Sequence, residues 1–144
     1  MKELIYTQRV AFGDCDPAGI VWFPNFFRWI DSSSRHFFVE CGVPPWHETE
    51  KTLGIIGTPL VDTHATFVNS ATYGDELQIH TSITEWRNKS FVQRHRIVRV
   101  NGKSGAPERI MECDEVRVFA ARRGDERTGI RAIPIPQSIR QLCE

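Results

Sequence analysis

Hydrophobic residues recur at helical spacing in the first third of the chain. The apolar positions are Phe26, Phe27, Ile30, Phe37, Phe38 and Cys41. Gly42 then supplies a stop signal, and two prolines follow it closely. The pattern predicts one long helix over residues 24–41, whose wide aromatic face needs a sheet packed against it.

Most of the remaining chain has the pattern of strands. Leu77, Ile79, Thr81 and Ile83 alternate with polar residues, which is typical of an antiparallel strand with one covered face. Further pieces of helix are expected at residues 46–53 and at the end of 130–144. The expected strands cover residues 4–12, 56–68, 76–86, 90–100 and 109–121. This order predicts an α+β fold in which a curled antiparallel sheet wraps around one long central helix.

Length and charge narrow the classes of function. A chain of 144 residues is expected to form a single domain, 1–144. Lys+Arg and Asp+Glu both number 18, so no overall field attracts nucleic acid or an anionic membrane. No apolar run approaches the ~20 residues of a membrane span, and the amino terminus lacks a signal-peptide core. Four widely spaced cysteines fit reduced thiols, so we expect a cytoplasmic protein.

Asp16 is the strongest candidate for chemistry. Pro17 and Gly19 favour a rigid turn that presents this carboxylate directly before the start of the long helix. The alternative is an aspartate that only closes its own turn, but the neighbouring Trp22 and Phe23 favour a functional role. Asp14 lies two residues away, and in an extended turn its side chain points to the opposite side. Only one of the two carboxylates is therefore expected to face a substrate.

The other chemical motifs are weaker. The chain has no G-x-S-x-G sequence, and its five histidines lack metal-ligand spacing, so we expect no metal site. His64, within an expected strand, is a candidate pocket residue, although such histidines more often bond within the fold. Arg87 and Lys89 place two cations in one turn between strands. That turn is an ordinary solvated hairpin unless the ligand carries phosphates.

Several segments together resemble a known family. The sequence DCDPAGIVW at residues 14–22, with Pro24, Asn25, Arg28 and Trp29 after it, is similar to the hotdog-fold acyl-CoA thioesterases of the 4-hydroxybenzoyl-CoA thioesterase family. Further similarity lies in CGVPPW, GTP, KSFVQRH and DEVRVF at residues 41–46, 57–59, 89–95 and 114–119. The resemblance spans nearly the whole chain. It implies dimers formed by edge-to-edge sheets, often two per tetramer, with active sites between subunits.

The resemblance also implies roles for individual residues. The catalytic aspartate falls on Asp16, and the backbone N–H that polarises the thioester carbonyl falls on Phe23, where the family pattern has tyrosine. Asp31 matches a position associated with the ring hydroxyl of the acyl group, with a solvent-facing helix carboxylate as the alternative. Arg87 and Lys89 match the turn that meets the phosphates of coenzyme A, although Asn88 replaces an expected arginine. The remaining expected substrate contacts are Trp22, Thr58 and His64.

The expected reaction is therefore hydrolysis of an aromatic acyl-CoA, with coenzyme A as part of the substrate and no separate cofactor. Asp16 either attacks the carbonyl or activates a water, and the sequence leaves both routes open. Asp62 and His64 differ from the family pattern, so the acid need not be 4-hydroxybenzoate. The alternatives are a thioesterase for short aliphatic acyl-CoAs and a non-catalytic acyl-CoA binding module. A dehydratase is disfavoured because no histidine and carboxylate are placed as that chemistry needs.

Overall fold

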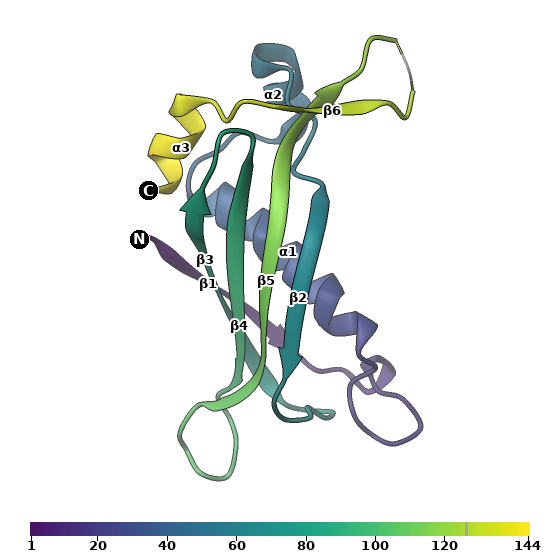
Figure 1. Cartoon of the computed structure of the whole chain (residues 1–144). Helices are drawn as coiled ribbons and strands as arrows, with labels where there is room; N and C mark the ends of the chain where they lie inside the picture. Colours follow the sequence, from purple (N-terminus) through teal and green to yellow (C-terminus); the bar gives the residue numbers. More distant parts are fainter. Residues whose placement is uncertain (126) are drawn as a thin grey trace.

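A computed structural model describes residues 1–125 and 127–144. These residues form an antiparallel sheet of six strands and three α-helices (Figure 1). The 3-10 turn Phe12–Asp14 separates β1 from α1. The elements are β1 (Glu3–Arg9), α1 (Pro24–Glu40), α2 (Trp46–Leu53), β2 (Leu60–Phe67), β3 (Glu76–Trp86), β4 (Ser90–Arg99), β5 (Glu108–Arg122), β6 (Ile130–Ile133) and α3 (Gln137–Cys143).

The strands are ordered β1-β3-β4-β5-β2 across the sheet, and β6 pairs with the end of β5. All pairs are antiparallel, as the alternation of polar and apolar residues predicted. β2 pairs with β5 on one side only, and seven of its eight residues are exposed. The sheet therefore ends in a long, uncovered edge strand.

Helix α1 runs across one face of the sheet (Figure 1). Its buried aromatic residues belong to two separate apolar clusters. Phe26 and Trp29 pack in the first cluster, whereas Phe37 and Phe38 pack in the second with Phe91 of β4. Ser33 and Ser34 are also buried, at the middle of α1. A polar layer therefore separates the two halves of the core.

The observed elements agree with most of the sequence predictions. Strand β3 has the predicted bounds, and α1 ends one residue before the predicted end. α1 is the longest of three helices in the described residues, and α2 and α3 lie where further pieces of helix were expected. The sequence did not predict β6, because its four residues form a strand only by pairing with β5. Its pattern alone is too short to indicate a strand.

The described residues contain no helix with both the length and the apolar character needed to span a membrane. The four cysteines are free thiols, and Cys41, Cys113 and Cys143 are buried.

The shape of the sheet and the packing of α1 leave two regions in which ligand chemistry is feasible: the loop before α1 and a cavity beside the middle of α1.

Candidate active site

The loop before α1 is a closed turn that orients Asp16. The Asp16 N–H donates to the Ile20 carbonyl at 2.9 Å, and the Gly19 N–H donates to the Asp16 carbonyl at 2.9 Å. Gly19 has a φ of +82°, a conformation that glycine adopts without the strain a Cβ would bring. The Ala18 N–H donates to Asp16 Oδ1 at 2.9 Å. One carboxylate oxygen therefore holds the turn, and within the described residues Oδ2 has no hydrogen-bond partner.

Asp14 has a different task from Asp16. Its Oδ2 accepts the Ala11 N–H at 2.8 Å and so closes the 3-10 turn. The Asp14 carbonyl accepts the Trp22 N–H at 2.9 Å and the Asn25 side-chain amide at 2.9 Å. These bonds draw the loop back against the start of α1. Asp14 Oδ2 is therefore already bonded, whereas Asp16 Oδ2 is not; that only one of the two faces a substrate stays a prediction.

The start of α1 leaves one backbone donor unused. Phe23 occupies the N-cap position, and its side chain caps no backbone N–H. Pro24 has no N–H, while the Asn25 and Phe26 N–H groups donate to the carbonyls of Trp22 and Phe23 at 2.9 and 3.1 Å. Across the described parts of the chain, the Phe23 N–H meets no acceptor. An unpaired N–H at a helix start is suited to stabilise a developing negative charge.

Aromatic side chains surround this loop and are unusually exposed. Trp22 is 56% exposed and Phe23 is 59% exposed. Phe12 and Tyr73 are also exposed, with ring centroids 6.0 Å apart in an edge-on arrangement. A group of exposed aromatic residues marks a surface that a ligand or another chain covers. Trp22, a predicted substrate contact, lies on this surface.

A cavity of about 680 Å³ lies beside the middle of α1 and contains two other predicted residues. Asp31 and Thr58 line it, whereas Asp16, Trp22 and Phe23 do not. Its other lining residues come from α1, α2, the segment before β2, the start of β2, β5 and β6: Phe27, Ser34, Arg35, Trp46, Ile56, Gly57, Pro59, Leu60, Glu115, Arg117 and Ile130. Within one chain, the predicted site residues therefore fall into two separate groups.

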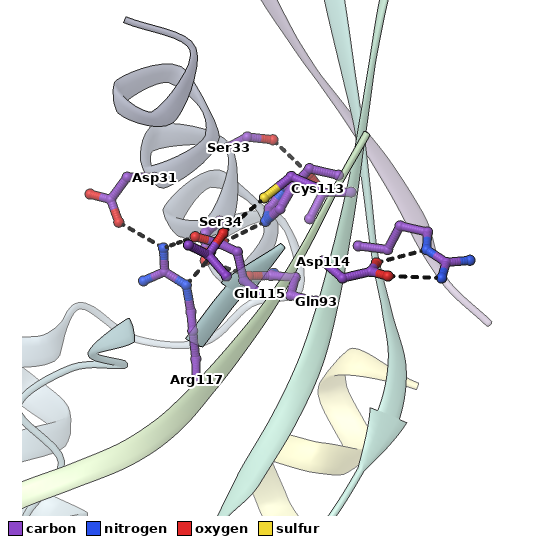
Figure 2. Close-up of polar contacts among 12 residues, drawn as sticks. Asp31, Ser33, Ser34, Gln93, Cys113, Asp114, Glu115 and Arg117 are labelled. Atoms are coloured by element: carbon purple, nitrogen blue, oxygen red, sulfur yellow. Dashed lines mark hydrogen bonds and ion pairs between the residues drawn. The ribbon is translucent and has the colours of Figure 1, made fainter. Parts of the chain in front are cut away.

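Charged residues extend from the cavity into the core. The Arg117 guanidinium lies between two carboxylates (Figure 2), with Nη2 3.0 Å from Asp31 Oδ1 and 3.0 Å from Glu115 Oε2. Arg117 Nε donates to Glu115 Oε1 at 3.1 Å, and Nη1 donates to the Thr58 carbonyl at 2.9 Å. Glu115 Oε1 is also 2.7 Å from His95 Nε2. These contacts connect α1 and the segment before β2 to the interior of the sheet.

The polar chain continues beyond His95 to α1. His95 Nδ1 lies 2.8 Å from Thr81 Oγ1, which lies 2.7 Å from Ser33 Oγ. Ser34 Oγ separately donates to Gln93 Oε1 at 2.5 Å. These residues make up the polar layer between the two apolar clusters. Buried polar groups that are bonded in this way fix the relative position of the elements that carry them.

Burial and charge oppose each other within this layer. Burial alone would raise the pKa of Glu115, but hydrogen bonds and the charges of His95 and Arg117 outweigh it and lower the pKa. Burial would lower the pKa of Arg117, but Glu115 and Asp31 raise it. Both groups are therefore stabilised in their charged forms at neutral pH.

The sequence analysis missed these residues. The His95 and Glu115 side chains are in contact and are 0% and 4% exposed. The alternation along β5 could have revealed them. Glu115 and Arg117 lie on the same inward face of this strand as the buried Met111 and Phe119. Charged residues at core positions of a strand are rarely unpaired.

The remaining predicted residues lie outside both regions. Arg87 is paired with Glu85, with Nε and Nη2 at 2.9 and 3.1 Å from its carboxylate oxygens. Lys89, in the same turn, makes no ion pair among the described residues. His64 lies on the outer face of the sheet and shares a small depression with Arg94 and Asp114. The structure therefore does not bring His64 to the cavity.

No group of three or more His, Cys, Asp or Glu side chains that could hold a metal ion occurs in ranges 1–125 and 127–144. The chemically distinctive features are instead a carboxylate with a free oxygen, an unpaired backbone N–H and a cavity with mixed apolar and charged walls.

Comparison with known proteins identifies the family. Residues 10–142 match the thioesterase-like superfamily. The chain is 49% identical over 142 residues to 4-hydroxybenzoyl-CoA thioesterase of Pseudomonas sp. strain CBS-3, covering 99% of this chain and 98% of the relative.

Solved structures agree with this match. One is a mutant of 4-hydroxybenzoyl-CoA thioesterase, with an aspartate replaced by asparagine, in complex with 4-hydroxybenzoyl-CoA. It has a TM-score of 0.94 and 47% identity, and the match covers 100% of this chain and 100% of that chain. A gentisyl-coenzyme A thioesterase has a TM-score of 0.78 and 33% identity, with 98% of this chain and 100% of that chain covered. The chain has the hotdog thioesterase fold, is a thioester hydrolase, and belongs to the thioesterase-like superfamily, within the family of 4-hydroxybenzoyl-CoA thioesterase.

Proposed function

We propose that this protein hydrolyses an aromatic acyl-CoA of the 4-hydroxybenzoyl-CoA class to the free acid and coenzyme A. The observation that carries the proposal is the free Asp16 oxygen in a closed turn next to a helix start with an unpaired Phe23 N–H. The 49% identical relative from Pseudomonas and the ligand of the related mutant structure support this substrate class.

Asp16 supplies the reactive oxygen in either of two routes. In the first, it attacks the thioester carbonyl, coenzyme A leaves as the thiolate, and water opens the resulting mixed anhydride. In the second, it removes a proton from a water that attacks the carbonyl directly. Both routes place negative charge on the carbonyl oxygen, where one donor such as the Phe23 N–H contributes roughly 3–4 kcal/mol. Neither route draws on a metal or a separate cofactor.

The working site includes residues from two subunits. Asp31 follows Phe23 by eight residues, which places it about 12 Å further along α1. Asp31 lines the cavity beside α1, whereas Asp16, Trp22 and Phe23 of the same chain do not. We infer that the acyl group meets Phe23 of one copy of the chain and Asp31 of another. In this arrangement Trp22 and Thr58 contact the substrate, while His64 on the outer face takes no part.

Strand β2 is the surface by which two copies associate. It is a sheet edge paired on one side only, and Val61 and Phe67 are 62% and 50% exposed. A long apolar edge strand pairs readily with another strand. We expect a dimer, or a dimer of dimers, in which the sheet curls around α1 as its one long central helix. Each chain acts as a single domain, 1–144, in the cytoplasm.

The turn between β3 and β4 meets the phosphates of coenzyme A. Lys89 is available for this contact, whereas Arg87 must first leave Glu85 or bind phosphate with its remaining donors. Asn88 contributes only a neutral side chain here, and its carbonyl accepts the Ile135 N–H at 2.9 Å. Binding of the nucleotide end therefore depends mainly on Lys89.

A thiol-release assay tests this proposal with hydroxybenzoyl, benzoyl, phenylacetyl and aliphatic CoA esters. We expect the highest kcat/KM with a hydroxybenzoyl ester. A higher kcat/KM with the short aliphatic esters would replace the proposed substrate by the aliphatic alternative. Binding of these esters without thiol release from any of them would indicate a binding module.

A further inference from the structure

Arg117 contacts two carboxylates that differ sharply in their exposure to solvent. The side chain of Glu115 is 4% exposed, and the side chain of Asp31 is 74% exposed. Arg117 itself is 7% exposed and makes contacts through all three guanidinium nitrogens. A fully bonded, buried arginine therefore holds one oxygen of an exposed helix carboxylate.

Residues behind Arg117 keep its guanidinium in place. Glu115 binds it through two nitrogens, and the Thr58 carbonyl accepts from the third. Glu115 is in turn held by His95, at 2.7 Å. Because these partners lie on β4, β5 and the segment before β2, the guanidinium cannot turn without breaking several buried hydrogen bonds.

Asp31 is held so that one oxygen remains available. Its Oδ1 accepts from Arg117, whereas Oδ2 has no hydrogen-bond partner among the residues described. An exposed aspartate on a helix normally samples several rotamers, and the contact with Arg117 restricts it to one. Asp31 also lines the cavity. A ligand in the cavity therefore meets a fixed acceptor.

The charges that line the cavity balance. Two carboxylates, Asp31 and Glu115, are accompanied by two guanidinium groups, Arg117 and Arg35. Arg117 is paired with both carboxylates, whereas Arg35 Nη1 is buried without a hydrogen-bond partner among the described residues. A neutral group that donates a hydrogen bond, such as a ring hydroxyl, satisfies the free Asp31 oxygen without adding charge.

We propose that Arg117 is a positioning residue: by holding Asp31 in one orientation, this Arg117–Asp31 clamp gives Asp31 its selectivity for acyl groups that carry a hydrogen-bond donor. The inference rests on the proposed function, because it concerns the acyl end of the same substrate. Arg117 does not contact the acyl group and acts only through Asp31. The clamp operates in the same way when Asp31 serves the active site of a second copy.

The test measures selectivity as the ratio of kcat/KM for 4-hydroxybenzoyl-CoA to kcat/KM for benzoyl-CoA. We expect R117K to lower this ratio about tenfold, since lysine keeps the charge but loses the fork that holds Asp31. D31A should lower it to the same level, and R117K added to D31A should lower it no further. Additive losses in the double variant, or an unchanged ratio in R117K, would overturn the proposal.

Arg94→Lys is the matched control. Arg94 of β4 binds Asp114 of β5 through Nε and Nη2 at 2.8 and 3.1 Å, on the outer face of the sheet. Figure 2 shows Asp114 pointing away from the Glu115 and Arg117 cluster. R94K should leave the selectivity ratio unchanged. A role of Arg117 in folding alone would lower kcat/KM for both esters equally and leave the ratio as it was, which would also overturn the proposal.

Two additions keep the test decisive. If R117K does not fold, the double variant Glu115→Gln with Arg117→Met replaces the charged pair by uncharged side chains of similar size, and it should show the same loss of selectivity. Dissociation constants of the uncleavable thioethers 4-hydroxyphenacyl-CoA and phenacyl-CoA give the ratio without hydrolysis. If R117K changes the ratio of these dissociation constants but the unmodified protein releases no thiol from any ester, the proposed function is rejected and the clamp is retained. A binding ratio that R117K leaves unchanged would reject the clamp.

Discussion

His95 Nε2 lies 2.7 Å from Glu115 Oε1 in the interior of the sheet, where both side chains are almost fully removed from solvent. This contact connects β4 to β5 at the level of the buried serines of α1. The pKa of Glu115 is lowered by His95 and Arg117 despite its burial, so protonation of Glu115 is expected to destabilise the fold.

The lowered pKa of Glu115 predicts the direction of acid denaturation. Its folded pKa lies below the unfolded value of about 4.3, so its contribution is complete above that pH and is lost as the pH falls through the folded pKa. E115Q removes this titration and breaks the buried pair. We expect this substitution to lower the free energy of unfolding by about 3–5 kcal/mol at pH 7. Between pH 6 and about pH 3, the E115Q protein should then lose less of its remaining stability than the unmodified protein loses.

Urea unfolding at fixed protein concentration across this pH range measures the effect. D114N is the control, since Asp114 is paired with Arg94 at the surface and its lowered pKa should matter less. Equal losses on acidification in E115Q and the unmodified protein would assign the acid sensitivity to other groups.

Replacement of Asp16 separates chemistry from folding. Asparagine keeps the oxygen that accepts the Ala18 N–H, so D16N should fold and melt normally. Turnover should fall by roughly 10²–10⁴-fold, because the amide can neither attack the thioester nor accept a proton from water. Thiol release and thermal melting measure the two effects.

Asp14→Asn is the control for this variant, because Asp14 Oδ2 is already bonded to the Ala11 N–H. We expect D14N to keep most of its turnover. Near-normal turnover in D16N would remove Asp16 from the mechanism.

The pairing of Arg87 with Glu85 makes the two cations of the β3–β4 turn unequal. K89A should raise KM about fivefold at low salt, and R87A should raise it less. E85Q should lower KM, since it frees the Arg87 guanidinium for phosphate. KM at several salt concentrations checks these effects.

Lys103→Ala, in the β4–β5 loop at the opposite end of the sheet, is the control (Figure 1). KM values that do not change in any of the turn variants would leave Arg87 and Lys89 as ordinary surface charges.

A charge on the edge strand tests the two-subunit site. V61K places a lysine on exposed β2, which opposes pairing of this edge with another strand. We expect smaller assemblies by analytical ultracentrifugation and a loss of most turnover, with unchanged circular dichroism. V39K changes a similarly exposed valine on α1 and should affect neither. Full turnover in a monomeric V61K protein would place the whole site within one chain.

The sequence pattern predicted the elements whose formation depends on residues close together in the chain. The aromatic period and the glycine stop predicted α1 to within one residue, and alternation predicted β3 at its observed bounds. In both cases the preference lies in contacts among near neighbours. β6 was missed because its four residues depend on the distant partner β5.

The sequence by itself determined the Asp16 turn, because Pro17 fixes its own φ and Gly19 adopts the positive φ that the bend requires. Only the tertiary structure decided that His95 meets Glu115 and that Arg117 reaches Asp31. The hydrogen bonds of the polar layer depend on the register of β3, β4 and β5 and on how α1 lies across them. Register and packing are settled by the whole sheet at once, so no short stretch of sequence contains them.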